Sequence, residues 1–208
     1  MKERILLVDV DGTLLNWNLP FNEFMTRKGF PQLPDTDWYY SIASRHGCSP
    51  QQAQEFVNEF NSSSHIRTMK PLADSVEYVG KLHDLGFRFI AITNIGDAPE
   101  TYVNRKYNLV NVFGDVFDEL ICLPSGSDKQ TVLKRWENTG YFWIEDHMRN
   151  AEAGYEVGLK PILIEHPYNS HYKTDLFPTV SNSTPWKQIF GLVCMDYGIN
   201  PHRHTHQG

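Results

Sequence analysis

Short apolar runs alternate with amphipathic stretches over most of this chain. Five runs are too short for good helices and are rich in branched residues, so they predict buried strands at 5–8, 87–93, 119–123, 141–145 and 161–165. Helical periodicity follows or separates these runs at 74–85, 99–107, 129–138, 149–156 and 186–193. Short buried strands separated by helices predict an α/β fold with a parallel sheet covered by helices on both faces.

Residues 16–69 interrupt this alternation directly after the first strand. They contain no convincing strand pattern and three aromatic-rich stretches that predict helices at 21–30, at about 37–46 with a cap among Asp35 to Asp37, and at 51–60. We therefore expect a discontinuous core domain, 1–15 and 70–195, with a small helical domain, 16–69, inserted into it. We expect residues 196–208, which include three alternating histidines, to form a flexible tail without a metal site.

Composition narrows the possible partners. The 208 residues carry a net charge of -6 with acids and bases interspersed, so we expect no long nucleic acid as a partner. No stretch approaches the roughly 20 apolar residues that cross a bilayer, and the first residues lack the features of a signal peptide. The three cysteines show no metal-type spacing. These features predict a soluble cytoplasmic protein, and they leave open whether it forms a homodimer.

Two acids and a glycine end the first predicted strand. Alternate residues of a strand point to the same side, so Asp9 and Asp11 can face one point in space, and Gly12 allows a sharp turn around whatever is bound there. An Asp-Gly turn that merely closes a strand is the alternative, and on these residues alone the two interpretations are evenly balanced.

Polar residues also follow the other predicted strands. Thr93-Asn94 ends the second, Lys129 opens the helix after the third, and Glu145-Asp146 ends the fourth. Each has an ordinary explanation as a turn, a solvated charge or a helix cap. Ligands of parallel sheets bind beyond the carboxyl ends of the strands, so their joint occurrence there favours one functional site.

This set of residues suits phosphoryl transfer. A phosphate monoester is doubly negative, so carboxylates need a hard cation, and Mg²⁺ typically binds one or two of them together with the phosphate. Asp9 and Asp146 could hold Mg²⁺, Asp9 could attack phosphorus, and Asp11 could act as acid and base. The groups expected to bind the phosphoryl oxygens are Thr93, Asn94 and Lys129, with Gly12 at the turn.

The same motifs resemble the haloacid dehalogenase superfamily of phosphatases over nearly the whole chain. Asp9-Val10-Asp11-Gly12-Thr13, Thr93-Asn94, Lys129 and Glu145-Asp146 look like its four motifs. The resemblance implies a Rossmann-like core with a cap after the first strand. It also implies Asp9 as nucleophile, Asp11 as acid and base, and a metal held by Asp9, the main-chain carbonyl of Asp11 and Asp146. Asn150 stands where the family often has another acid.

Within this superfamily the chain most resembles the 5'(3')-deoxyribonucleotidases. This implies a (deoxy)nucleoside monophosphate as substrate, with Trp17 stacking on the base and Trp38 as a second aromatic contact. The cap aromatics could equally form the cap's own core, and Ser62-Ser63-Ser64-His65-Ile66 replaces an aromatic cluster of that subfamily. The alternatives are a phosphatase for a phosphoglycolate-like or sugar phosphate, and a non-catalytic phosphate-binding module.

Overall fold

A computed structural model describes residues 3–200 of the chain. Its centre is one sheet of six parallel strands in the order β3-β2-β1-β4-β5-β6. The strands are β1 (Ile5–Val8), β2 (Arg88–Thr93), β3 (Phe117–Cys122), β4 (Phe142–Glu145), β5 (Lys160–Ile164) and β6 (Thr179–Val180). The predicted α/β class with a Rossmann-like parallel sheet is confirmed, and the short edge strand β6 is an addition to it.

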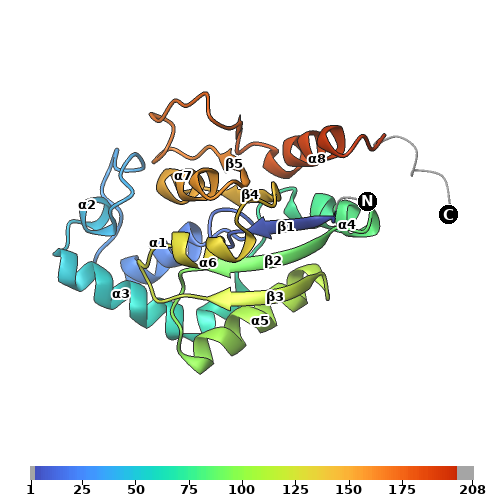
Figure 1. Cartoon of the computed structure of the whole chain (residues 1–208). Coiled ribbons are helices and arrows are strands. Elements are labelled where there is room, and N and C mark those ends of the chain that lie inside the picture. The colour runs from blue at the N-terminus through green and yellow to red at the C-terminus, as the bar shows by residue number, and fades with distance from the viewer. Residues whose placement is uncertain (1–2, 201–208) are drawn as a thin grey trace.

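Helices cover both faces of this sheet, as Figure 1 shows. Alternate residues of β1 serve the two faces: Leu6 and Val8 belong to one apolar cluster, whereas Ile5 and Leu7 belong to another. The first cluster includes side chains of α4 (Ser75–Asp84), α5 (Pro99–Phe113) and α8 (Pro185–Asp196). The opposite face is covered by α6 (Gln130–Leu133), a 3₁₀ turn (Lys134–Trp136) and α7 (Met148–Glu156).

The strand order places a switch point between β1 and β4. The chain builds the sheet outward from β1 through β2 to β3, and then returns to the other side of β1 to add β4, β5 and β6. Helices leave such a sheet in opposite directions at the switch point, which creates a crevice at the carboxyl ends of the strands. The acids that follow β1 and β4 therefore emerge side by side.

Residues 16–69, between β1 and β2, form a helical excursion that lies at the carboxyl ends of the strands (Figure 1). Its helices are α1 (Asn18–Arg27), α2 (Ile42–His46), α3 (Pro50–Ser62) and a 3₁₀ helix (Ser64–Thr68). The chain leaves and returns at adjacent points, since the Asn16 amide donates to the Lys70 carbonyl oxygen at 2.9 Å. Phe21, Phe24 and Phe60 are buried inside this excursion.

The predicted helix at about 37–46 is wrong in its first half. Asp35 has a φ of 55°, which is incompatible with a helix start, and α2 begins only at Ile42. Its N-cap is Ser41, whose hydroxyl accepts from the Ser44 amide at 3.3 Å. Residues 33–40 thus form an irregular loop, and α2 is a single short turn beside the site.

None of the helices within residues 3–200 is long and apolar enough to span a membrane. The three tail histidines lie outside the described residues.

Candidate active site

The loop after β1 places two acids and a glycine around one point. Asp9 is buried and Asp11 is partly exposed. Gly12 has a φ of 84°, and a Cβ there would lie 2.2 Å from Oδ2 of Asp146, so only glycine fits this turn. The Gly12 carbonyl oxygen is 2.8 Å from Nε2 of His166 in the loop after β5.

A buried lysine joins the ends of β1 and β4. The Lys129 ammonium donates to Oδ1 of Asp9 and, at 2.8 Å, to Oε1 of Glu145. Burial alone would lower the pKa of Lys129, but the two carboxylates reverse the shift and raise it above its usual value. Lys129 is therefore a fixed positive charge beside Asp9.

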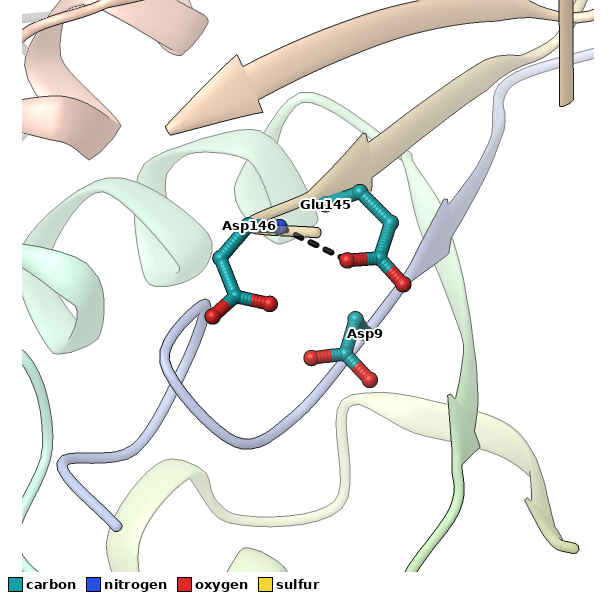
Figure 2. Close-up of side chains that lie close together, drawn as sticks. All are labelled: Asp9, Glu145 and Asp146. Carbon is teal, nitrogen blue, oxygen red and sulfur yellow. Dashed lines mark hydrogen bonds between the residues drawn. The ribbon is translucent and has the colours of Figure 1, made fainter. Parts of the chain in front are cut away.

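Glu145 accepts hydrogen bonds from the loop that follows β4. Its Oε2 accepts from the main-chain amides of Asp146 and His147 at 2.7 Å each, and its Oε1 also accepts from the Asn150 amide group at 2.7 Å. Figure 2 shows the bond to the Asp146 amide. Burial opposes ionisation of Glu145, yet the Lys129 charge and hydrogen bond, together with the His147 amide, lower its pKa. Both oxygens are committed, so Glu145 positions Lys129 and the following loop.

The carboxylates of Asp9, Glu145 and Asp146 converge, with ligand atoms within 4.8 Å of one another (Figure 2). Burial raises the pKa of Asp9 to about 7 despite the opposing effect of Lys129, and burial also raises that of Asp146 well above its usual value. The positive charge near Asp9 and Asp146 is therefore too small to balance both carboxylates when they are ionised. A hard divalent cation with oxygen ligands would supply the missing charge, so the donor set fits Mg²⁺.

Asp11 has a partner that the sequence pattern did not identify. Arg105 on α5 is fully buried and donates through Nη2 to Oδ1 and Oδ2 of Asp11 at 2.6 and 2.7 Å. The Thr93 hydroxyl also donates to Oδ2 of Asp11, at 3.3 Å. Arg105 lies within an ordinary amphipathic helix, without a turn or strand end beside it, so only its burial distinguishes it.

Asn94 lines the site together with the loop before α6. Its Nδ2 donates to the Ser127 carbonyl oxygen, whereas its Oδ1 and the Ser127 hydroxyl are buried without a partner among the described residues. The structure therefore places Thr93, Asn94, Lys129 and Gly12 around Asp9, as the strand-end pattern predicted, but Thr93 is directed at Asp11.

These residues form the floor of a pocket with a volume of ≈ 280 Å³. Its other wall comes from residues 16–69, through Trp17, Asn18, Tyr40, Ile42, Arg45, Val57 and Asn61. The sheet edge and the helical excursion thus each supply one side of the cavity.

The two predicted substrate tryptophans are separated. Trp17 lines the pocket, stacks on Phe21 with ring centroids 4.2 Å apart, and donates its indole N–H to Asn61 Oδ1 at 2.9 Å. Trp38 is 62% exposed and lines a neighbouring depression instead. Its position in the irregular 33–40 loop directs it away from the cavity above Asp9, so the structure brings only Trp17 to the candidate site.

Comparison with known proteins supports the fold. No family model matches the chain. A related sequence is the uncharacterized 32.4 kDa protein of the Gp30-rIII intergenic region of Enterobacteria phage T4, 24% identical over 164 residues, which are 76% of this chain. The chain spans 59% of the length of that relative.

Solved structures with the same architecture are haloacid dehalogenase-like hydrolases. The family protein SP0104 from Streptococcus pneumoniae matches with a TM-score of 0.66 at 12% identity, covering 92% of this chain and 98% of that one. A predicted phosphoglycolate phosphatase from Haemophilus somnus matches with a TM-score of 0.60 at 13% identity, covering 92% and 98%. This chain has a haloacid dehalogenase-like fold.

A further neighbour with this fold is the D,D-heptose 1,7-bisphosphate phosphatase from B. bronchiseptica, solved with magnesium and phosphate. It matches with a TM-score of 0.54 at 13% identity, covering 91% of this chain and 99% of that one. At such identities the likeness concerns the fold, and the chemistry must be argued from the pocket of this chain.

Proposed function

We propose that this protein is a magnesium-dependent phosphomonoester hydrolase of the haloacid dehalogenase superfamily. The observation that carries the proposal is the position of Asp9, buried at the floor of a pocket between the Lys129 ammonium and the Asp146 carboxylate. A buried carboxylate that is under-compensated and faces a cavity is suited to bind a cation and to attack a bound electrophile.

In the proposed mechanism an oxygen of Asp9 attacks phosphorus while the ester P–O bond breaks, which gives an aspartyl-phosphate and an alkoxide. Asp11 gives its proton to the alkoxide. It then takes one from the water whose oxygen displaces Asp9 from phosphorus, which returns both acids to their starting states.

Other groups of the pocket position the phosphoryl group. Lys129, the Asn94 amide and the main chain at Gly12 surround the place where its oxygens would lie. Mg²⁺ would be held by Asp9, the Asp11 main-chain carbonyl and Asp146, and when bound it supplies positive charge that offsets repulsion between the acids and the phosphate.

The substrate we propose first is a (deoxy)nucleoside monophosphate. Trp17 in the pocket wall and Tyr40 at its edge offer aromatic surface for a base. A phosphoglycolate-like or sugar phosphate is the alternative, favoured by the names of two structural neighbours, a phosphoglycolate phosphatase and a heptose bisphosphate phosphatase.

A substrate panel in the presence of Mg²⁺ tests both levels of this proposal. Hydrolysis of p-nitrophenyl phosphate that requires Mg²⁺ would support the phosphomonoesterase assignment. Deoxynucleoside 5'- and 3'-monophosphates should be cleaved with higher kcat/KM than sugar phosphates. Equal or lower values would remove the nucleotidase assignment and leave the general one intact.

A non-catalytic phosphate-binding module is the less favoured function. It would usually have lost the nucleophile, the acid and base, or the lysine, whereas Asp9, Asp11 and Lys129 are all present and converge here. Phosphate binding without turnover of any ester in the panel would favour the module.

A further inference from the structure

A buried arginine lies in the wall of the pocket that faces the sheet edge. Arg45 belongs to α2, is 5% exposed, and lines the cavity with Tyr40 and Ile42. Burial of a guanidinium is costly unless anions or several acceptors surround it. The surroundings of Arg45 therefore indicate what this charge serves.

Only neutral groups surround the Arg45 guanidinium within hydrogen-bond distance. Nη1 donates to Asn18 Oδ1 at 2.9 Å, and Nη2 donates to Gln32 Oε1 at 3.2 Å and to Asn22 Oδ1 at 3.4 Å. Among residues 3–200 no carboxylate forms an ion pair with it, and its Nε is buried without a partner. Asp37, which accepts from Gln32 Nε2 at 2.7 Å, acts on Arg45 only from beyond ion-pair distance, and burial still lowers the pKa of Arg45. Guanidinium has five N–H donors, and three of them account for these bonds.

The other buried cations near the pocket differ in this respect. Lys129 is paired with Asp9 and Glu145, and Arg105 is paired with Asp11. Their charges are used within the protein. Of the two basic side chains that line the pocket within the described residues, Lys129 and Arg45, only Arg45 forms no ion pair with a carboxylate.

We propose that Arg45 binds a second anionic group of the substrate, at the end opposite to the transferred phosphoryl group. The substrate class is then a small phosphate monoester that bears a carboxylate or a further phosphate. This inference rests on the proposed phosphatase function, and within it Arg45 favours the phosphoglycolate-like or sugar phosphate alternative over a nucleoside monophosphate, which has no second anionic group. The phosphoryl group lies at Asp9 on the sheet edge, the second anion lies on the helical wall, and the cavity of ≈ 280 Å³ suits a compact molecule between them.

A purely structural role for Arg45 explains less of the arrangement. The contact that ties α2 to the 33–40 loop uses its main-chain oxygen, which accepts from the Leu33 amide at 2.9 Å. The amide oxygens of Asn18, Asn22 and Gln32 could be satisfied by neutral donors. They orient the guanidinium without neutralising it, which leaves its charge for a ligand.

The test compares kcat/KM for substrate pairs that differ by one anionic group. One pair is phosphoglycolate and ethyl phosphate, which probes a carboxylate. The other is 1,3-propanediol bisphosphate and propyl phosphate, which probes a second phosphate. We expect the wild type to favour at least one doubly anionic partner by on the order of 10- to 100-fold. The pair that shows the preference identifies which anion is recognised.

Substitution of Arg45 distinguishes recognition from structure. In Arg45→Met this selectivity ratio should fall to near 1, mainly through KM, and Arg45→Lys should restore part of it. Arg27→Met is the matched control, because Arg27 ends α1, is exposed, and contacts His65 instead of the pocket. This control should keep the wild-type ratio.

The results that overturn the inference are distinct from those that overturn the enzyme assignment. A wild-type ratio near 1 in both pairs, or a ratio that survives Arg45→Met, removes the second-anion site while phosphatase activity stands. If no ester is cleaved, including p-nitrophenyl phosphate, the enzyme assignment fails. Calorimetric binding of the same pairs to Asp9→Asn protein then decides the inference, with equal affinities counting against it.

Discussion

The two walls of the pocket satisfy their charges in different ways. At the sheet edge, the two buried basic side chains form ion pairs with carboxylates. Lys129 pairs with Asp9 and Glu145, and Arg105 pairs with Asp11. On the helical wall, Arg45 is held by neutral amides, and the remaining lining side chains are aromatic, aliphatic or amide groups. Rigid strand ends fix groups that must keep one geometry through a reaction, whereas the helices present groups whose final partner can be the substrate. We therefore expect substitutions on the edge to affect turnover and those on the helices to affect selection.

The largest effect should come from substitution of Asp9, the proposed nucleophile. Asp9→Asn should lower kcat by roughly 10³-fold or more, because an amide is a poor nucleophile of nearly the same size. Steady-state kinetics with p-nitrophenyl phosphate measures this. Circular dichroism should show an intact fold, and activity within tenfold of the wild type would contradict the role assigned to the sheet edge.

Gly12 tests how tightly that edge is built. In Gly12→Ala the new Cβ would lie 2.2 Å from Asp146 Oδ2 at a φ of 84°, so Asp146 must move. We expect a loss of activity of roughly 10²-fold and a loss in the free energy of unfolding beyond the ~1 to 2 kcal/mol of the backbone strain alone. Urea denaturation and kcat measure the two effects.

Gly29→Ala is the matched control for this substitution. Gly29 has a φ of 86°, but no heavy atom lies within 4 Å of its added Cβ. Gly29→Ala should lower the free energy of unfolding through backbone strain but leave kcat unchanged. Equal behaviour of the two variants would mean that the contact between Gly12 and Asp146 is unimportant.

Arg105 tests whether Asp11 must be held in place. Arg105→Met should lower kcat by roughly 10- to 100-fold for an alkyl phosphate, because Asp11 loses its bidentate contact. Turnover of p-nitrophenyl phosphate should fall less, since its leaving group needs little protonation. Arg105→Lys should recover part of the activity. An equal loss with both leaving groups would indicate a structural role.

The two tryptophans of residues 16–69 differ in burial: Trp17 lines the pocket, whereas Trp38 lies outside it. Trp17→Ala should cost roughly 3 kcal/mol or somewhat less, because Trp17 stacks on Phe21 and bonds Asn61. Trp38→Ala should change the free energy of unfolding by at most about 0.5 kcal/mol, because that side chain is 62% exposed. Urea denaturation checks both. KM for a deoxynucleotide should rise in Trp17→Ala and not in Trp38→Ala. A rise in Trp38→Ala would indicate that Trp38 contacts the substrate.

The last prediction concerns the effect of pH and Mg²⁺ on stability, which requires no substitution. Burial raises the pKa of Asp9 from 3.8 to about 7, so between these values the folded protein holds a proton that the unfolded chain has lost. Raising the pH through this window therefore lowers the stability of the metal-free protein. At pH 8 saturating Mg²⁺ should raise Tm, with a gain of about 2.7 kcal/mol at 100 times Kd, and at pH 5 the gain should be smaller.

Thermal unfolding with and without Mg²⁺ across this range measures that effect. Asp9→Asn supplies the control, since it lacks this titrating group while Asp146, whose pKa burial also raises, still titrates. The fall in metal-free Tm between pH 4 and pH 7 should therefore be smaller in Asp9→Asn than in the wild type, and the same pH dependence in both proteins would contradict the raised pKa of Asp9.

Much of the sheet edge could be predicted from the sequence. Apolar runs of strand length fixed β1, β2, β4 and β5, and the polar residues directly after them had to meet wherever parallel strands end together. The prediction failed where local signals competed. Asp35 to Asp37 resembled a helix cap. However, Asp35 has a positive φ and the N-cap is Ser41, so α2 begins only at Ile42. The two-residue strand β6 carries too little pattern to detect.

By itself the sequence determined the α/β class, the helical excursion and the cluster of acids at the strand ends, because hydrophobic periodicity and turn chemistry are local properties. Only the tertiary structure decided which charges pair. Arg105 meets Asp11 across 94 positions, Arg45 lines the pocket without forming an ion pair, and Trp38 lies outside the pocket. Periodicity tells which face of a helix is buried. The strand order and the path of the 33–40 loop determine what that face meets.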